Sequence, residues 1–231
     1  PAGEPTGALY GVTTMLLRII EDFQPTYLAA CYDLPEPTYR HDAYAEYKGK
    51  REKTDDALVT QMTRSRDLLT AFGIPIYEAP GFEADDVLGT IAHKLVSNES
   101  VRVIIASGDM DTMQCVDNDR VQVYTLKKGI KDTVIYNEQA VVDRFGFDPK
   151  LLPDYKGLRG DSSDNIIGIP GIGEKTATTL ITKFGSIENI YKKLGQSPKT
   201  GNNWRASGAV ARFLSQSVGG TAQDAQTLSR I

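Results

Sequence analysis

Closely spaced acidic residues recur along the chain, and their spacing could serve a bound metal ion. Glu83, Asp85 and Asp86 lie within four residues, at the start of a predicted helix. Asp109 and Asp111 directly follow an apolar run. Carboxylates this close together repel one another, and a divalent cation supplies the compensating charge. The pattern therefore favours hydrolysis that uses hard cations such as Mg²⁺ or Mn²⁺.

Two further segments add three acids, which brings the set to eight. Asp33 ends a short apolar run, and Asp161 and Asp164 are three residues apart, so both would face the same way on a helical turn. Each group could also serve local structure alone. Acids complement the dipole at a helix N-terminus, and Asp109 could cap the short helix that begins at Asp111.

The apolar spacing predicts an α/β fold that could bring these acids together. We expect helices over 7–23, 55–71 and 83–96, and strands over 27–33, 74–78 and 101–107. Because strand and helix alternate, the strands should pair in parallel, with ligands gathering outside their carboxyl ends. Two β-rich runs, 121–128 and 131–136, predict a hairpin at which the parallel pattern ends.

The second part of the chain is predicted to be helical. We place a catalytic domain over 1–149 and a helical subdomain over 150–231. Within the latter, a turn through Gly171 and Gly173 leads into a helix that carries Lys175. Such a turn points backbone N–H groups at phosphate and is typical of a helix-hairpin-helix that binds a nucleic-acid backbone. The alternative is a plain turn between helices.

The segment 34–54 is long, polar and basic, without a clean apolar period, and loops of that length are usually functional. Its aromatic rings could stack on bases and its cations could bind phosphates, although it could also be a solvated basic loop. The residues that we single out in it are Arg40, Tyr47, Lys48, Lys50 and Arg51.

The composition sets bounds on the function. The chain has 231 residues, 40% of them hydrophobic, which predicts one good-sized domain with a small appendage. Cys31 and Cys115 are too few for a disulfide scaffold, and neither a membrane span nor a leader pattern is visible, so we expect a cytoplasmic protein. The net charge of −4 argues against a nucleic-acid partner, but without the eight acids 26 basic residues would face 22 acidic ones.

Together these motifs resemble the 5'-nuclease, or flap endonuclease, superfamily, and within it the N-terminal 5'-3' exonuclease domains of bacterial DNA polymerase I. The resemblance covers residues 5 to about 195. It rests on Pro5-Thr6-Gly7-Ala8, Tyr39-Arg40-His41, Tyr47-Lys48, Gly81-Phe82-Glu83-Ala84-Asp85-Asp86, Gly108-Asp109-Met110-Asp111, Leu158-Arg159-Gly160-Asp161, Ser163-Asp164-Asn165 and Gly168-Ile169-Pro170-Gly171-Ile172-Gly173-Glu174-Lys175-Thr176-Ala177.

The resemblance implies a PIN-like α/β domain with a mainly parallel central sheet, a helical arch at about 34–54, and a helix-hairpin-helix subdomain that holds DNA with a bound K⁺. It places Lys48 and Arg51 at the scissile phosphate, and it implies two or more Mg²⁺ or Mn²⁺ ions. The positions that match the family's metal-binding carboxylates are Asp33, Glu83, Asp85, Asp86, Asp109, Asp111, Asp161 and Asp164. We assign Asp33, Glu83, Asp85 and Asp109 to a first ion and Asp111, Asp161 and Asp164 to a second.

The function expected from this resemblance is a structure-specific 5'-3' exonuclease or flap endonuclease of bacterial DNA replication and repair. It would cut DNA with 5' flaps, nicks or RNA primers, act as a monomer away from membranes, and possess a fused polymerase domain in its parent protein. The family's first strand, with a further metal-binding Asp, would precede Pro1. One alternative is therefore a fragment that binds branched DNA without cutting it. A small-molecule phosphohydrolase is a second alternative, but it leaves the basic segment and the Gly-rich turn unexplained.

Overall fold

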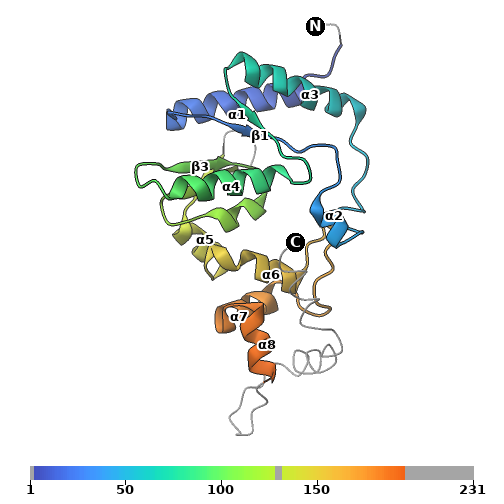
Figure 1. The fold of residues 1–231 in the computed structure, drawn as a ribbon, viewed down its shortest axis with the longest axis vertical. Coiled ribbons are helices and arrows are strands. Elements are labelled where there is room, and N and C mark those ends of the chain that lie inside the picture. The colour runs from blue at the N-terminus through green and yellow to red at the C-terminus, as the bar shows by residue number, and fades with distance from the viewer. Residues whose placement is uncertain (1–2, 128–131, 196–231) are drawn as a thin grey trace.

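A computed structural model describes residues 3–127 and 132–195 of the chain (Figure 1). The turn expected around Gly129 and the tail beyond residue 195 lie outside the described residues. None of the described helices is both long and apolar enough to cross a membrane. The elements of the N-terminal region are α1 (Gly7–Phe23), β1 (Ala30–Cys31), α2 (Tyr39–Ala43), α3 (Asp56–Ala71), β2 (Ile76–Tyr77), α4 (Ala84–Val96), β3 (Val103–Ala106), the 3-10 helix η1 (Met110–Cys115), β4 (Val121–Leu126) and β5 (Thr133–Tyr136).

The described strands form two small sheets. β1 pairs in parallel with β2, and the second sheet has the order β3-β4-β5. β3 and β4 are parallel, whereas β4 and β5 form the predicted antiparallel hairpin. The parallel pattern thus ends at this hairpin, where β5 runs antiparallel to β4. α4 contacts both β1 and β3, so one helix bridges the two sheets.

β1 is shorter than the predicted strand 27–33, because a strand extends only as far as its partner pairs with it. Its register has two residue pairs, Ala30 with Ile76 and Cys31 with Tyr77. Among the described residues, β1 has a strand neighbour on one side only, and so does β3.

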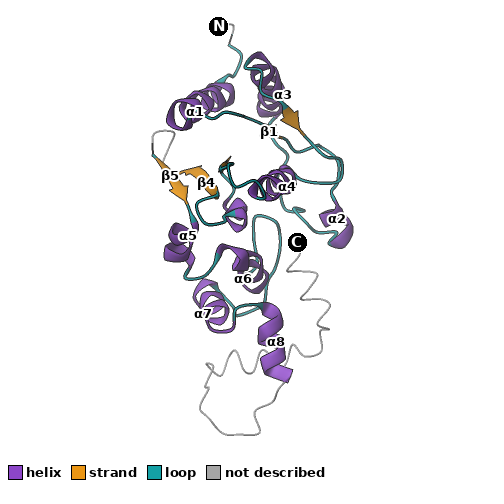
Figure 2. Ribbon diagram, turned by 60° about the vertical axis from the view of Figure 1, so that its left-hand side comes forward, coloured by secondary structure: helices purple, strands orange, loops and turns teal. Residues whose placement is uncertain are grey.

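The core is divided in the same way as the sheets. α1 and α3 lie side by side at one end of the molecule (Figures 1 and 2) and enclose a small cluster with Leu16, Leu69 and Ile74 at its centre. A larger cluster extends from β3 and β4 into the C-terminal helices and includes the fully buried Met113, Val123 and Ile181. The C-terminal helices are therefore packed on the α/β region through apolar side chains, the interaction that contributes most to holding them there.

The C-terminal region is helical, as predicted. Its elements are α5 (Glu138–Phe145), the 3-10 helix η2 (Pro149–Leu151), α6 (Leu152–Arg159), α7 (Glu174–Phe184) and α8 (Ile187–Gly195). α6 packs against α7, and α7 against α8. The connection between α6 and α7 is longer than a tight hairpin and runs over residues 160–173.

The segment 34–54, expected to form an arch, contains one short helix, α2, followed by turns. Thr38 begins this helix with a capping box: the Thr38 N–H donates to His41 Nδ1 at 3.0 Å. The turns continue with the Lys48 N–H, which donates to the carbonyl of Asp164 at 3.0 Å. The segment therefore contacts the α6–α7 connection, beside which α2 lies in Figure 1.

A candidate metal centre of acidic side chains

The start of α4 positions three of the predicted acids. Glu83 is the N-cap of the helix, and Asp86 accepts a hydrogen bond from the Glu83 N–H at 2.8 Å. Asp33 reaches across from the end of β1 and accepts from the Ala84 N–H at 2.7 Å. A helix N-terminus has N–H groups without helical partners and a positive dipole end, which is why acids are favourable here.

Asp85 lies in the middle of a first acidic group, which consists of Asp33, Glu83, Asp85 and Asp109. Burial, together with the charges of Asp109, Asp33 and Glu83, raises the pKa of Asp85 to about 6, while Lys48 opposes this shift. Asp109 comes from another element: it caps η1 by accepting from the Asp111 N–H at 2.8 Å. Carboxylates from the segment after β1, from the start of α4 and from the segment after β3 thus share one electrostatic environment that disfavours a further negative charge.

A second acidic group consists of Asp111, Asp161 and Asp164. One carboxylate oxygen of each lies within 4.8 Å of the others, and all three side chains are partly buried. Asp111 lies in η1, whereas Asp161 and Asp164 come from the α6–α7 connection. The structure therefore brings residues from distant parts of the chain to one point, as the sequence predicted.

Lys156 joins the second acidic group, although the sequence pattern did not predict it there. Its ammonium forms ion pairs with Asp111 and, at 2.5 Å, with Asp161. Burial alone would raise the pKa of Asp161, but hydrogen bonds from Lys156 and Ser163 outweigh it and lower the pKa to about 2. The available signal was a lysine in the last turns of a helix that ends just before an acidic cluster.

Asp86 is disposed differently from the other acids. Both of its oxygens accept from the Arg40 guanidinium, at 2.7 and 2.8 Å, and one also accepts from the Glu83 N–H. Although burial raises the pKa of Asp86, these bonds lower it overall. Asp86 thus contributes to holding Arg40 and the start of α4, and its oxygens are already used. Arg40, expected to bind DNA, has a side chain only 12% exposed, because it is held in this bidentate pair.

Tyr47 is buried, contrary to the prediction. It was expected to offer an aromatic face to DNA, but it is 3% exposed. Its hydroxyl lies 3.1 Å from both Glu83 Oε2 and Asp164 Oδ2, so it bridges the two acidic groups. Burial and these two charges raise the pKa of Tyr47 well above its usual value, which keeps the hydroxyl protonated as a donor. The ring is buried because its hydroxyl must reach two carboxylates inside the site.

Three predicted cations of the segment 34–54 differ in their exposure. Lys48 Nζ pairs with Glu83 at 2.6 Å, and its side chain is 20% exposed. Arg51 pairs with Asp164 at 2.8 Å, but its side chain is 53% exposed. Lys50 is exposed at the surface. Lys48 and Arg51 therefore each bind one acidic group, and both retain access to solvent.

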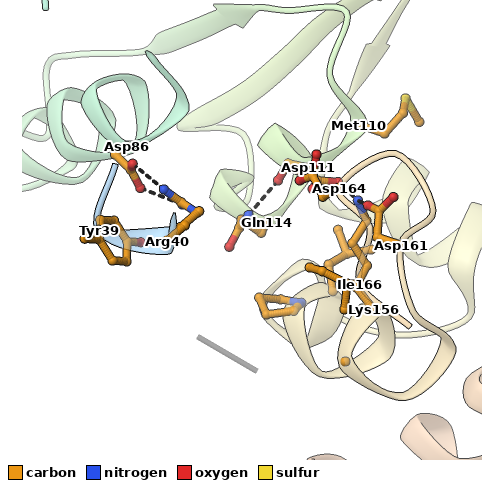
Figure 3. A pocket seen from close by; sticks show the side chains of 13 residues that line it. Tyr39, Arg40, Asp86, Met110, Asp111, Gln114, Lys156, Asp161, Asp164 and Ile166 are labelled. Carbon is orange, nitrogen blue, oxygen red and sulfur yellow. Dashed lines mark hydrogen bonds and ion pairs between the residues drawn. The ribbon is translucent and has the colours of Figure 1, made fainter. Parts of the chain in front are cut away.

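A pocket of about 250 Å³ opens beside the second acidic group (Figure 3). Arg40 and Asp86 line one side of it, and Lys156 with the second acidic group lines the other, with Gln114 between them. The lining also includes apolar side chains such as Leu152 and Ile166. The acidic oxygens are thus accessible from a hollow surface rather than sealed in the core.

The Gly-rich turn lies apart from the acids and contributes nothing to the lining of that pocket. Gly171 has φ +84°, a conformation that L side chains rarely adopt, and a Cβ there would meet no neighbour. Gly173 is the N-cap of α7, and both glycines and Lys175 are exposed. The turn therefore presents backbone and one cation to solvent at the start of a helix.

The donor set fits a hard divalent cation. Both acidic groups offer carboxylate oxygens, the ligands that Mg²⁺ and Mn²⁺ prefer. Cys115 is no competing soft ligand, since burial raises the pKa of its thiol to about 11, with Asp85 adding to the shift. Burial likewise raises the pKa of the Cys31 thiol. The basic side chains that now pair with the acids show how much negative charge the site must balance.

Two family models cover the chain. The model described as "5'-3' exonuclease, N-terminal resolvase-like domain" matches residues 1–146, and the model described as "5'-3' exonuclease, C-terminal SAM fold" matches residues 147–226. DNA polymerase I of Bacillus caldotenax is 42% identical over 194 residues, which are 84% of this chain and 22% of that protein. DNA polymerase I of Mycobacterium tuberculosis is 40% identical over 188 residues, 81% of this chain and 21% of that protein. The chain thus spans about a fifth of the length of these relatives.

Solved structures show the same fold. The T5 5'-exonuclease with bound zinc ions has a TM-score of 0.69 and 21% identity, and the match covers 99% of this chain and 78% of that one. The catalytic core of Rad2 in complex with DNA substrate has a TM-score of 0.53 and 20% identity, and the match covers 89% and 62%. The predicted fold class, a PIN-like α/β domain followed by a small helical one, is confirmed by these likenesses and by the family models.

Proposed function

The chain belongs to the 5'-3' exonuclease family, and we propose that it hydrolyses phosphodiesters of DNA, and of RNA primers, at 5' flaps and nicks. The observation that carries this proposal is the gathering of seven carboxylates from four segments beside Lys48 and Arg51. A purely structural site would not concentrate so many like charges, because their repulsion destabilises the fold.

We assign Mg²⁺ or Mn²⁺, two or more ions, to the acids. The first acidic group would hold one ion and the second acidic group another. Bound there, the ions would supply an activated water and stabilise the leaving oxygen, as in other two-metal sites. Tyr47 supports both groups, because its single hydroxyl hydrogen is shared between Glu83 and Asp164. Asp86 is not proposed as a metal ligand; it holds Arg40 and the first turn of α4 in place.

Lys48 and Arg51 are proposed to bind the scissile phosphate. In the present arrangement each cation is paired with an acid that a metal ion would neutralise. A metal ion bound by these acids would balance their charge, and Lys48 and Arg51 would then be available to the phosphate, on which charge develops in the transition state. Lys50 is proposed to contact the DNA from the surface of the same segment.

The Gly-rich turn is proposed to hold the duplex. Gly171 and Gly173 present backbone groups, with a K⁺ ion as the family resemblance implies, and Lys175 adds a phosphate contact. We further propose that the protein acts as a monomer in bacterial replication and repair, in the cytoplasm, and that a polymerase domain is fused to it, as the DNA polymerase I relatives suggest.

The alternative is a protein that binds branched DNA without cutting it. One observation favours it: Lys48, Arg51 and Lys156 already neutralise part of the acidic charge without any metal. The deciding assay uses protein expressed from the complete reading frame that encodes these residues, with a 5'-labelled flap duplex and millimolar Mg²⁺. We expect cleavage near the flap base, none with a chelator, and a fall of about two orders of magnitude for Asp111→Asn. Binding of the flap without cleavage would instead establish the alternative.

Lys175→Ala tests the role of the Gly-rich turn. Loss of a single phosphate contact should weaken duplex binding about equally for all sequences and reduce the salt slope by about one unit. Affinities measured across a salt series give this slope, and Lys94→Ala, on exposed α4 surface, is the matched control. An unchanged slope, or a loss confined to particular base sequences, would remove Lys175 from the interface.

A further inference from the structure

The loop 160–168, which carries Asp161 and Asp164, is closed on itself by two glycines. A Cβ on Gly168 would lie 2.2 Å from the Gly160 nitrogen, and a Cβ on Gly160 would lie 2.6 Å from the Ile167 oxygen. Between these two glycines, the backbone N–H groups and carbonyls of Asp161 and Ile166 form two reciprocal hydrogen bonds, of 2.8 and 2.7 Å. The two ends of the loop are therefore held against each other by its own backbone.

Asn165 fastens this loop to the basic segment 44–51. Its side-chain Nδ2 donates to the Glu46 backbone carbonyl at 2.8 Å, and its backbone carbonyl accepts from the Tyr44 hydroxyl at 3.2 Å. The side chain is buried, with 7% of the residue exposed, and the backbone has φ +60°. Asn tolerates this left-handed conformation better than most residues, so both its backbone and its amide suit the position.

The neighbours of Asn165 in the loop carry the chemistry. Asp164 accepts from the Lys48 N–H through its carbonyl and from Arg51 through its carboxylate. Ser163 accepts from the Arg51 Nε through its carbonyl at 3.4 Å. The contacts of Asn165 therefore lie beside those of Asp164 with Lys48 and Arg51. These contacts of Asp164 set the distance between a proposed metal ligand and the two cations proposed to bind the phosphate.

We propose that Asn165 is a positioning residue for the reaction. By tying the loop 160–168 to segment 44–51, it holds the second acidic group at the distance from Lys48 and Arg51 that the scissile phosphate requires. Asn165 itself touches neither substrate nor metal. The role rests on the proposed nuclease function, since the geometry that it sets matters only when Lys48 acts on a phosphate.

Asn165→Gly is the decisive variant, because glycine keeps the positive φ and removes only the amide. The matched control is Asn118→Gly, which makes the same change at φ +50° in an exposed turn outside both acidic groups. We expect the single-turnover rate on a 5' flap to fall about 10- to 100-fold for Asn165→Gly, since small misplacements of catalytic groups have effects of this size. Flap affinity should stay within about threefold, and the control should cleave at the wild-type rate.

A double-mutant cycle distinguishes positioning from a general structural effect. If Asn165 acts by holding the second acidic group at its distance from Lys48 and Arg51, then Asn165→Gly should cost at most about twofold in a background that lacks both cations, Lys48→Ala with Arg51→Ala. Additive losses, or a wild-type rate for Asn165→Gly, would overturn the proposal.

Hydrogen exchange gives a readout that does not depend on cleavage. The Lys48 N–H, bonded to the Asp164 carbonyl, should exchange at least about tenfold faster in Asn165→Gly than in the wild type, because local opening exposes it. Unchanged exchange would refute the tie between loop and segment. Faster exchange in a protein whose wild type fails to cut flaps would leave the tie standing and reject the nuclease function.

Discussion

Lys48→Ala is expected to lower the single-turnover rate on a 5'-flap duplex by about 10²- to 10³-fold while weakening flap binding by no more than a few-fold. The reason is that Lys48 lies beside the acids with a side chain that is mostly shielded, at 20% exposure, so its charge acts in a poorly screened environment. A charge that is aimed at a developing negative charge contributes in the transition state and little in the ground state.

Two companion variants bound this effect. Arg51→Ala should cost less than Lys48→Ala, because the Arg51 side chain is 53% exposed and solvent screens its charge. Lys53→Ala removes a nearby lysine that is 84% exposed and paired with Asp56, and it should cleave at the wild-type rate. Rates measured at saturating enzyme separate chemistry from binding. An unchanged rate with weaker affinity for Lys48→Ala would reduce the segment to a docking surface.

Millimolar Mg²⁺ is expected to raise the melting temperature of the protein, and Asp85→Asn should remove most of that increase. An ion that binds only the native state stabilises it by about 2.7 kcal/mol at 100 times its dissociation constant, which is roughly 5–10 °C for a chain of this size. Asp85 lies among three other acids, so its charge serves the metal-bound state and destabilises the metal-free one.

Without metal, the same variant, Asp85→Asn, is expected to raise the stability of the protein rather than lower it. The native pKa of Asp85 is about 6 and lies above its unfolded value, so the stability that it contributes is present at low pH and is lost as the pH rises through about 4 to 6. Above pH 7 Asp85→Asn should therefore be more stable than the wild type by about 1–2 kcal/mol, after a discount for partial exposure.

Thermal melts at pH 5 and pH 7.5, with and without Mg²⁺, test both the stabilisation by metal and the destabilisation by Asp85 in its absence. The Mg²⁺-dependent increase of the wild type should shrink at pH 5, because the ion must displace a proton from Asp85. Asp154, whose pKa is raised to about 6 by burial and by Glu188, titrates in the same range, so only the difference between the wild type and Asp85→Asn isolates the site. Asp67→Asn, on exposed α3 surface, is the control. A wild type that Mg²⁺ leaves unaffected at pH 7.5 would contradict the metal assignment.

The acids could be predicted from the sequence because strand ends and helix starts have local signals. An apolar run before Asp109, and an apolar stripe behind Glu83 and Asp85, were enough to predict that these residues gather outside the carboxyl ends of the strands. The three helices that were predicted with bounds, over 7–23, 55–71 and 83–96, agree with α1, α3 and α4 to within a residue, since helical spacing is a local property. β1 was not predicted as closely, because the length of a strand depends on a partner that lies elsewhere in the chain.

The basic side chains could not be placed from the sequence. Arg40 was expected to bind DNA and is held by Asp86, and Tyr47 was expected to face DNA and is buried between Glu83 and Asp164. Lys156 was not predicted among the acids that surround it. A cation or hydroxyl in a polar segment has no periodicity that indicates its partner, and only the folded chain determines which acid it meets.

The bonds between the loop 160–168 and the basic segment have a consequence for how this protein could have diversified. The two family models meet at residues 146 and 147, which suggests two interchangeable modules. Yet Tyr47 and Arg51 from the first module contact Asp164 from the second. In the other direction, the Asn165 amide donates a hydrogen bond to the Glu46 carbonyl. Neither module holds all the residues of the proposed site. Recombination at that junction would exchange half of the proposed active centre, so the two modules should be inherited together and should tolerate substitutions along their contact only in compensating pairs.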